Sequence, residues 1–302
     1  MLQNMDKGFI ECEFFEDASA ALEGSSSWAS CTKNGGHLGF IPYPDFQIGH
    51  LPSAWQRREV FQETVDLAER TVKLTIGHTS TDRPDVFRFS NLNRPGIVRS
   101  GSGWMEKVVH RSDVPCPCSD CSRDGVTPQE TWFEAVVITA RHVVFNEEEA
   151  KSTLVDLHYD TKESRKDGSM QRLQAYCFLL SEGVEDACSL ACAAHDIKKA
   201  QLEFPLQLTL IPSTKPNIGK TDLCVVISHP HGNPKKITLG EVKDFNPSGS
   251  EFLVRYDSGT CPGSSGAPVI VFYEDGNSLV VHSMGNVTDG INQGSCVAFK
   301  MK

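Results

Sequence analysis

The sequence predicts a mainly β protein, and three observations carry this prediction. Short segments rich in Val, Ile, Leu and Thr recur from residue 96 to the end of the chain. Gly, Pro, Asn and Asp separate them at short intervals, as turn residues do in all-β barrels and sandwiches. A sustained helical period is confined to residues 54–70, where apolar side chains recur at helical spacing.

Composition and charge narrow the class of protein. Apolar residues make up 39% of the 302 residues and charged residues 23%, which excludes a disordered or collagen-like chain. The formal net charge of −10 argues against a nucleic acid or an anionic membrane as the main partner, because both require a basic face. No apolar run approaches the roughly 20 residues that span a bilayer.

The amino terminus and the cysteines predict a compartment. Residues 1–7 contain no basic start followed by an apolar stretch, so we expect no signal peptide. The chain contains 11 cysteines, an odd number. Without export, these are expected to be reduced thiols or metal ligands rather than essential disulfides. The predicted location is intracellular, either cytoplasmic or nuclear.

The chain divides into three predicted regions. Residues 1–52 show no sustained period and are expected to form a loosely ordered extension. Residues 53–95 are expected to lead into the main domain, with a helix over 54–70 that starts at a capping-box pattern. Residues 71–76 alternate as a half-buried strand does. Residues 96–302 form the predicted β domain.

Ten strands are expected in that domain, together with one later segment of helical character over residues 186–201. The expected strands are Gly96–Trp104, Ala135–Thr139, Leu154–His158, Ala175–Leu180, Leu206–Ile211, Cys224–Ser228, Lys236–Val242, Phe252–Tyr256, Pro268–Phe272 and Leu279–His282.

The turn around Ser265 is the first candidate for a chemical role. Residues 260–269 read Thr-Cys-Pro-Gly-Ser-Ser-Gly-Ala-Pro-Val. Gly-x-Ser-Gly-x-Pro before an apolar strand suits a tight turn that presents a serine hydroxyl. In such a turn, the amides of Gly263 and Ser265 can both point at a developing oxyanion. The alternative is an ordinary Ser/Gly-rich turn between strands.

A serine needs a base to take its proton, and His142 is the candidate. It follows the apolar stretch Val136–Thr139 and a small Thr-Ala turn. A lone histidine at a strand end is the alternative, since the chain has 10 histidines. The combination of Thr-Ala-x-His-Val-Val with a later Gly-x-Ser-Gly-x-Pro is much harder to obtain by chance.

Together with further motifs in the same order, these residues resemble the trypsin-like (chymotrypsin-fold) serine proteases. The resemblance is closest to the intracellular Deg-like and glutamyl-endopeptidase-like types. The additional segments that carry it are Gly101–Trp104, Val226–Gly232 with Thr238–Val242, and His282–Gly285. The likeness spans about residues 96–300.

This resemblance implies two antiparallel β-barrels of the chymotrypsin fold behind an N-terminal helical extension, with the active site between the barrels. It also implies a triad of His142, Asp196 and Ser265. Asp196 leads a segment that is more polar than the family's usual aspartate strand, so Asp156 and Asp186 stay as alternatives. The implied oxyanion hole consists of the amides of Gly263 and Ser265.

The residue before the nucleophile departs from the secreted members of the family. Those members carry an aspartate there, which pairs with a newly cut amino terminus. This chain has Ser264 at that position. Activation by that ion pair is therefore excluded, and we expect the enzyme to be gated in another way.

The family's substrate-binding positions fall on four residues of this chain: Thr260, His282, Ser283 and Gly285. A threonine hydroxyl and a histidine around the primary pocket resemble the pockets of proteases that cleave after Glu or Gln. A hydroxyl and an imidazole can hydrogen-bond a carboxylate or an amide. The alternative is a core histidine beside a pocket for aromatic side chains.

Cys116, Cys118 and Cys121 form a separate cluster, flanked by Pro and Gly. Three thiols in one short loop are typical of a tetrahedral zinc site. The fourth ligand is open among Cys188, Cys192, Cys177 and His110, and a loop of reduced cysteines is the alternative to structural zinc. Catalysis is expected to need no cofactor.

The predicted function is therefore a serine endopeptidase that acts on proteins or peptides, with no nucleic-acid or membrane partner and an open oligomeric state. A catalytically inactive, protease-like binding module is the main alternative, because such a fold can persist after a triad residue is lost. An α/β-hydrolase esterase is disfavoured, since it requires Gly-x-Ser-x-Gly with the histidine after the serine.

Overall fold

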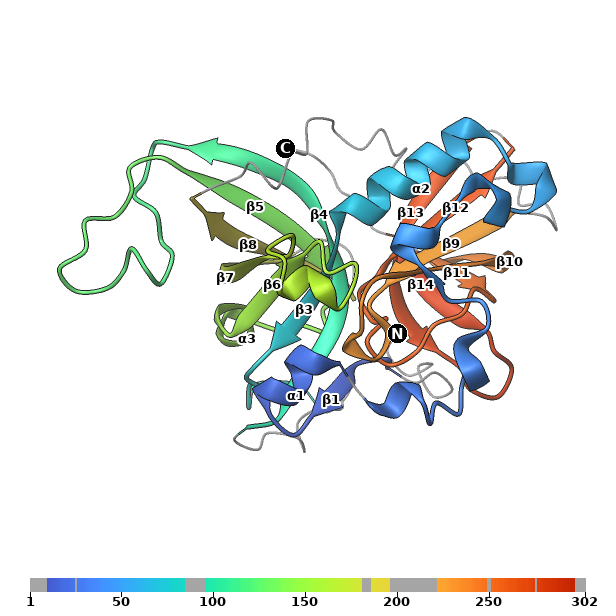
Figure 1. Ribbon diagram of the computed structural model, residues 1–302, viewed down its shortest axis with the longest axis horizontal. Helices are drawn as coiled ribbons and strands as arrows, with labels where there is room; N and C mark the ends of the chain where they lie inside the picture. Colours follow the sequence, from blue (N-terminus) through green and yellow to red (C-terminus); the bar gives the residue numbers. More distant parts are fainter. Residues whose placement is uncertain are drawn as a thin grey trace.

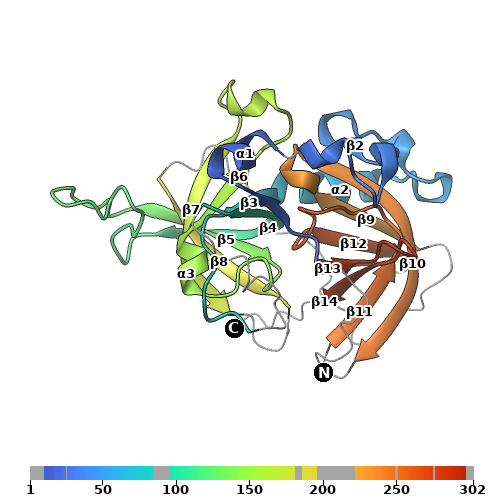
Figure 2. The same ribbon diagram turned by 90° about the horizontal axis from the view of Figure 1, so that it is seen from below.

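The computed structural model describes residues 10–24, 26–84, 96–180, 186–195, 222–248, 251–274 and 276–296. Two antiparallel β-barrels lie side by side in it (Figures 1 and 2). The first barrel contains β3 (Thr71–Ile76), β4 (Val98–Arg111), β5 (Trp132–Thr139), β6 (Thr153–Leu157), β7 (Gln171–Leu180) and β8 (Cys188–Ala194). The second contains β9 (Leu223–Ser228), β10 (Lys236–Ser248), β11 (Glu251–Tyr256), β12 (Pro268–Tyr273), β13 (Gly276–Gly285) and β14 (Asn292–Cys296).

Each barrel is closed by one further strand pairing. The first follows the order β4-β3-β6-β7-β8-β5 and closes through β4 and β5. The second follows β11-β14-β13-β12-β9-β10 and closes through β11 and β10. Closure pairs the two outer strands of each six-stranded order with each other, which reduces the number of unpaired backbone groups in antiparallel sheets. The prediction of a mainly β chain with two antiparallel barrels is confirmed.

The N-terminal region adds one short strand to each barrel. β1 (Glu13–Phe15) pairs with β4, and β2 (Ile41–Pro42) pairs with β10. The other short elements of the chain are α1 (Ala18–Glu23), η2 (Ser26–Trp28), η3 (Gly35–His37), η4 (Tyr43–Asp45), η5 (Ile48–His50), η6 (Ser53–Trp55), α3 (Glu147–Lys151), η8 (Glu163–Arg165) and η9 (Pro230–Gly232). The described part of the predicted loose extension therefore has more defined structure than expected. Single turns and strands of two or three residues produce no sequence period, so the sequence did not predict them.

The predicted helix over 54–70 forms as α2 (Arg58–Arg70), after the separate turn η6. Its N-cap is Arg57 rather than the predicted Ser53, and no side chain caps it. Val60, Leu67 and Ala68 are buried in a core that also contains apolar side chains of both barrels. α2 contacts β4 of the first barrel and β9 and β12 of the second, so it joins the two (Figure 1).

Two expectations about the first barrel differ from the structure. β3 is part of this barrel, which therefore begins at Thr71, before the predicted boundary at residue 96. All six of its residues are buried, including Lys73, whose Nζ donates to the Ala21 carbonyl at 2.6 Å. Both faces of β3 are therefore buried, although its alternating sequence predicted a strand with one face exposed to solvent.

The predicted helical character of 186–201 is wrong for residues 188–194, which form β8. This strand is made of Cys, Ser, Leu and Ala and is buried along its whole length between β5 and β7. Barrel packing overrides the helix preference of alanine and leucine here. The predicted strand Leu206–Ile211 lies outside the described residues.

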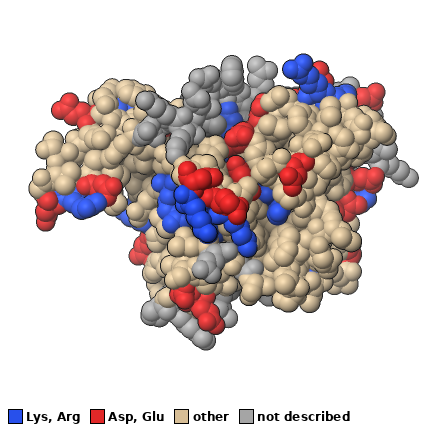
Figure 3. All heavy atoms as spheres, in the orientation of Figure 1, with Lys and Arg blue, Asp and Glu red and all other residues tan. Residues whose placement is uncertain are grey.

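Among the described residues, no helix is both long enough and apolar enough to cross a membrane. On the face drawn in Figure 3, acidic and basic side chains lie next to one another near the centre.

Candidate active site

The turn that carries Ser265 is built on two glycines with positive φ, Gly263 at +95° and Gly266 at +82°. A Cβ on Gly263 would lie 2.5 Å from the His229 carbonyl oxygen, and one on Gly266 would lie 2.1 Å from Thr139 Oγ1. Both positions therefore require glycine. The Ser265 carbonyl accepts a hydrogen bond from the Ser102 amide at 2.8 Å, which joins the turn to the first barrel.

His142 lies at the end of β5, where its ring contacts a carboxylate. Its Nδ1 is 2.9 Å from both carboxylate oxygens of Asp186, and its backbone amide donates to Asp186 Oδ1 at 3.1 Å. Asp186 was one of the two alternatives to Asp196. The other alternative, Asp156, pairs with the guanidinium of Arg172 at 2.6 and 2.8 Å. Asp196 lies outside the described residues.

A buried ionic cluster supports the main chain at His142. The guanidinium of Arg83 donates to the His142 carbonyl at 3.0 Å and pairs with Glu149 at 2.6 Å. Arg99 pairs with the same carboxylate and donates to the Val143 carbonyl at 3.0 Å. Removing one partner of such a cluster strands a buried charge, which typically costs about 3–5 kcal/mol. The cluster therefore fixes the histidine turn.

The main chain of Glu11 occupies the Ser265 turn. Its carbonyl oxygen accepts hydrogen bonds from the amides of Gly263 at 2.7 Å and Ser265 at 3.1 Å. Its own amide donates to Ser265 Oγ at 2.9 Å. The two amides named from the sequence thus converge on one carbonyl oxygen, which belongs to the chain's own N-terminal segment.

The Glu11 side chain is buried between two polar partners, His282 and Lys33, from distant parts of the chain. His282 Nε2 lies 2.7 Å from Glu11 Oε2, and the Lys33 ammonium pairs with the other carboxylate oxygen. Lys33 also donates to Thr260 Oγ1 and Asn292 Oδ1, each at 2.8 Å. All three ammonium protons therefore have an acceptor.

Electrostatics keep this buried carboxylate ionised. Burial alone would raise the pKa of Glu11, but the hydrogen bond from His282 and the charge of Lys33 outweigh it and lower the pKa to about 2. Burial lowers the pKa of His282, so its imidazole is neutral at pH 7. The hydroxyl of Tyr256 lies 2.6 Å from His282 Nδ1 and donates to it, because a neutral ring that donates through Nε2 must accept at Nδ1.

Cys12, the residue after Glu11, is the neighbour of His142 on this segment. Burial alone would lower the pKa of His142, but the Asp186 carboxylate and the Cys12 thiol outweigh this effect and raise the pKa to about 9. Within the described part of the chain, His142 Nε2 is buried and has no hydrogen-bond partner. Ser265 and His142 therefore lie against the two successive residues Glu11 and Cys12.

The structure brings most of the predicted site residues together. Gly263, Ser265 and His282 contact Glu11, and a Cβ on Gly285 would lie 2.6 Å from Glu11 Oε1. Thr260 contacts Lys33, the ion-pair partner of Glu11. Ser283 contacts Ser295 instead, with their hydroxyl oxygens 3.4 Å apart.

Three contributors were missed by the sequence analysis: Glu11, Lys33 and Tyr256. Glu11 and Lys33 belong to the region without a period, and Tyr256 ends a strand with no motif of its own. No local signal in the sequence marks them.

The cysteine loop between β4 and β5 gathers around a histidine. Cys116, Cys118 and Cys121 place their Sγ atoms 3.1, 3.3 and 3.3 Å from Nε2 of His195, which follows β8. His195 was not among the four residues considered as a fourth ligand.

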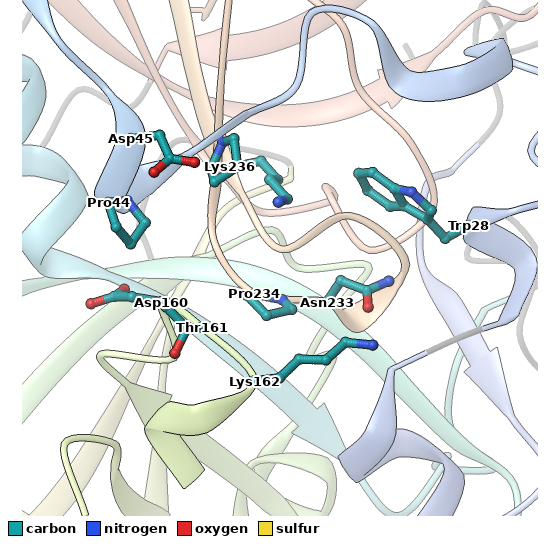
Figure 4. A pocket seen from close by; sticks show the side chains of 10 residues that line it. Trp28, Pro44, Asp45, Asp160, Thr161, Lys162, Asn233, Pro234 and Lys236 are labelled. Carbon is teal, nitrogen blue, oxygen red and sulfur yellow. The ribbon is translucent and has the colours of Figure 1, made fainter. Parts of the chain in front are cut away.

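A cavity of about 380 Å³ lies apart from these groups (Figure 4). Its lining comes from the N-terminal turns, the loop after β6 and the start of β10, and includes Trp28, Lys162 and Lys236. None of the residues that line it belongs to the Ser265 turn.

Two closed antiparallel barrels with a glycine-bounded serine turn between them define the class of chymotrypsin-fold peptidases. Residues 124–278, just over half of the chain, match the family described as "Trypsin-like peptidase domain". The chain belongs to this family and is a protease, whose substrates are proteins or peptides. No curated protein sequence matches the chain.

Two similar solved structures are both of the Rv3671c protease. The inactive form shares 16% sequence identity over 81% of this chain and 89% of that chain, with a TM-score of 0.41. The active form, from M. tuberculosis, shares 16% identity over 82% of each chain, with a TM-score of 0.43.

Proposed function

We propose that this protein is a serine endopeptidase that cleaves peptide bonds after glutamate. The observation that carries the proposal is the Glu11 carbonyl, which accepts hydrogen bonds from Gly263 and Ser265 while the Ser265 hydroxyl contacts the same residue. Two amides aimed at one carbonyl oxygen would stabilise the oxyanion that forms when that carbon is attacked.

In this mechanism, Ser265 Oγ attacks the carbonyl carbon and His142 takes the hydroxyl proton. His142 then gives the proton to the leaving amine. Asp186 accepts from His142 Nδ1 and so leaves Nε2 free to act as the base. Each oxyanion donor would contribute about 3–4 kcal/mol to the transition state. We assign to Asp186 the role that the sequence analysis gave to Asp196.

The pocket around Glu11 supports glutamate as the preferred residue before the cut. Lys33 supplies a positive charge, and His282 supplies a hydrogen bond whose direction Tyr256 fixes. An aromatic side chain in this pocket would leave Lys33 and His282 without acceptors in a buried site, which is costly. A glutamine would keep the hydrogen bonds but lose the ionic attraction.

The triad prediction compares aspartates. Ser265→Ala and His142→Ala should each abolish cleavage of a peptide substrate without unfolding the protein, because the catalytic groups act as a unit. Asp186→Asn should lower kcat by about 10⁴-fold, since the imidazole would lose its oriented tautomer. Asp156→Asn serves as the control and should leave kcat within a few-fold. Loss of activity in Asp196→Asn with normal activity in Asp186→Asn would return the role to Asp196.

The same variants distinguish the binding-module alternative. A fluorophosphonate probe should label the wild-type protein at Ser265 and fail to label Ser265→Ala. A folded wild-type protein that is not labelled at any concentration, and that cleaves no peptide, would be a binding module.

The specificity prediction uses peptides that differ only at the residue before the cut. Turnover should follow the order Glu, Gln, Phe, with Lys poorest because it meets the Lys33 ammonium. Lys33→Met should lower kcat/KM for the Glu peptide by roughly 10- to 100-fold, the value of a charge-assisted hydrogen bond, and should affect the Gln peptide less. Lys243→Met, at an exposed ion pair, is the control. Equal cleavage after Glu and Phe would contradict this pocket.

We also propose a structural zinc ion at Cys116, Cys118, Cys121 and His195. A tetrahedral zinc with bonds of about 2.0–2.3 Å places its ligand atoms about 3.3–3.8 Å apart. The distances from the three thiols to His195 Nε2, 3.1 to 3.3 Å, are close to this range. Such an ion would fasten the long loop between β4 and β5 to the end of β8 without taking part in catalysis.

The zinc prediction concerns content and stability. Cys116→Ser should remove one zinc per chain and lower the Tm by roughly 5 °C or more, because the loop loses the ion that ties it to the end of β8. Cys177→Ser, a half-buried thiol outside the cluster, should change neither the zinc content nor the Tm appreciably. Full zinc content in Cys116→Ser would exclude the site.

A further inference from the structure

We infer that the N-terminal segment is the enzyme's own first substrate, and that Ser265 cleaves the Glu11–Cys12 bond within the same chain. This inference rests on the proposed peptidase function and extends it to regulation. Three sets of contacts on the segment support it, one on each side of the bond and one at the bond itself.

On the amino-terminal side of the bond, Glu11 fills the pocket that would select the residue before the cut. Its carboxylate has two polar contacts there, one with His282 and one with the Lys33 ammonium. Glu11 as a whole residue is only 3% exposed. A charged side chain is rarely buried to this extent unless it is paired, and here the pairing groups belong to the walls of the pocket.

On the carboxyl-terminal side, the segment continues as a strand added to the first barrel. In the register of β1 on β4, Glu13 lies opposite Ser100 and Phe15 lies opposite Val98. Addition of an extended peptide to a sheet edge is a general mode of peptide recognition. The segment is therefore held in an extended conformation directly after the bond, as a substrate must be.

At the bond, the two catalytic groups lie against successive residues of the segment. Ser265 contacts the Glu11 amide, and the thiol of Cys12 lies near His142. Ser265 is fully buried under this segment, so a second peptide cannot reach it while the segment stays. The intact chain is thus blocked by the residues that it is arranged to cut.

The reaction is an ordinary hydrolysis. Ser265 Oγ bonds to the Glu11 carbonyl carbon, the carbon–nitrogen bond to Cys12 breaks, and His142 passes the serine proton to the new amine of Cys12. Water then adds to the ester, restores the serine hydroxyl and releases Glu11 with a free carboxylate. No oxidant, metal or cofactor is consumed.

Intact mass measurement of the purified full-length chain tests this inference. The wild-type protein should convert to a species that begins at Cys12, at a rate independent of protein concentration, while Ser265→Ala should keep the Glu11–Cys12 bond. Glu11→Ala should slow the conversion at least 10-fold, and Glu16→Gln, an exposed acidic neighbour, should not. Fluorophosphonate labelling should become faster as conversion proceeds.

Two results would overturn the inference, and they are distinct from failure of the proposed function. A wild-type chain that keeps the bond while it cleaves peptides and reacts with the probe is a protease without self-processing. Conversion of Ser265→Ala at the wild-type rate would mean that another protease makes the cut. A chain that has lost residues 1–11 and shows neither activity nor labelling would overturn the proposed function itself.

A second group of residues carries an independent proposal: we propose that Cys31, His37, His231 and Cys261 bind a zinc ion next to the active site. Each residue offers one ligand atom, and these atoms all lie within 4.8 Å of one another. The two sulfur atoms are 3.6 Å apart, and Cys261 Sγ is 3.4 Å from His37 Nε2. These distances fit the edges of a zinc tetrahedron, about 3.3–3.8 Å.

The surroundings orient the imidazoles as zinc ligands require. His231 Nδ1 lies 2.8 Å from Glu13 Oε2. When Nδ1–H donates to this carboxylate, the lone pair of Nε2 is free to bind a metal ion. That Nε2 is buried and has no hydrogen-bond partner among the described residues, in a side chain only 2% exposed. Trp28 stacks on the His37 ring with a centroid distance of 3.6 Å, which holds the second imidazole in place.

This site would join the N-terminal region to the catalytic turn. Cys31 and His37 lie on either side of Lys33, which contacts Glu11, and Cys261 lies two residues before Gly263. Glu13, on the carboxyl-terminal side of the proposed cut, holds His231. A zinc ion here would therefore keep Lys33 in the pocket wall after the segment before Cys12 has left.

Zinc content of the native protein tests this proposal. Wild-type protein should hold two zinc ions per chain, Cys31→Ser and Cys261→Ser should each hold one, and Cys31→Ser combined with Cys116→Ser should hold none. Cys177→Ser should keep both. Far-UV circular dichroism confirms that each variant is folded.

Unchanged zinc content in folded Cys31→Ser and Cys261→Ser would overturn the second site. A mass two daltons lower before reduction, with Cys31 and Cys261 joined, would replace it with a disulfide. A single zinc lost with Cys31→Ser but kept in Cys116→Ser would retain this site and exclude the one at Cys116.

Discussion

The hydrogen bonds from Gly263 and Ser265 to the Glu11 carbonyl are the contact on which the arrangement of the site depends. They require two glycines in a left-handed conformation, a turn fastened to the first barrel, and an extended peptide across it. Ordering each residue of that peptide costs about 1–2 kcal/mol of backbone entropy. The added strand β1, the buried ion pair of Glu11 and the contacts of Glu13 offset this cost. The segment is therefore held by several contacts, which together position the Glu11 carbonyl at the two amides.

Under the proposed function, the charges around Glu11 account for a pocket that holds this residue in the intact chain and selects glutamate in a substrate. Lys33 has three acceptors while Glu11 is present: Glu11 itself, Thr260 and Asn292. When Glu11 leaves, two neutral acceptors remain around a largely enclosed ammonium. A buried charge that has lost its counterion is strongly destabilised. The vacated pocket is thus poised for another carboxylate, and His282 and Tyr256 are already oriented to bind it.

Turns and strands with a local sequence pattern could be predicted from the sequence. Residues whose position depends on tertiary contacts could not. The glycine turn at Ser265 and the strand before His142 carry their geometry in local sequence, so both could be identified. β8 could not, because its alanines and cysteines become a strand only between β5 and β7. Asp186 has no local motif, and its position against His142 follows from where β8 begins. Lys33 and Glu11 come together only in the folded chain, where the N-terminal region packs against Thr260 and His282.

The side chain before the nucleophile shows how this protease can be gated without a new amino terminus. Ser264 is fully buried, and its hydroxyl contacts Ser228 Oγ at 3.1 Å and accepts from the Cys261 amide at 3.2 Å. These neutral contacts satisfy the position that holds an aspartate in secreted relatives, so the turn needs no incoming ammonium to take its shape. Its two amides already converge on one oxygen atom. Under the proposed function, activity is limited by what occupies the turn, and we expect removal of Glu11 to open it.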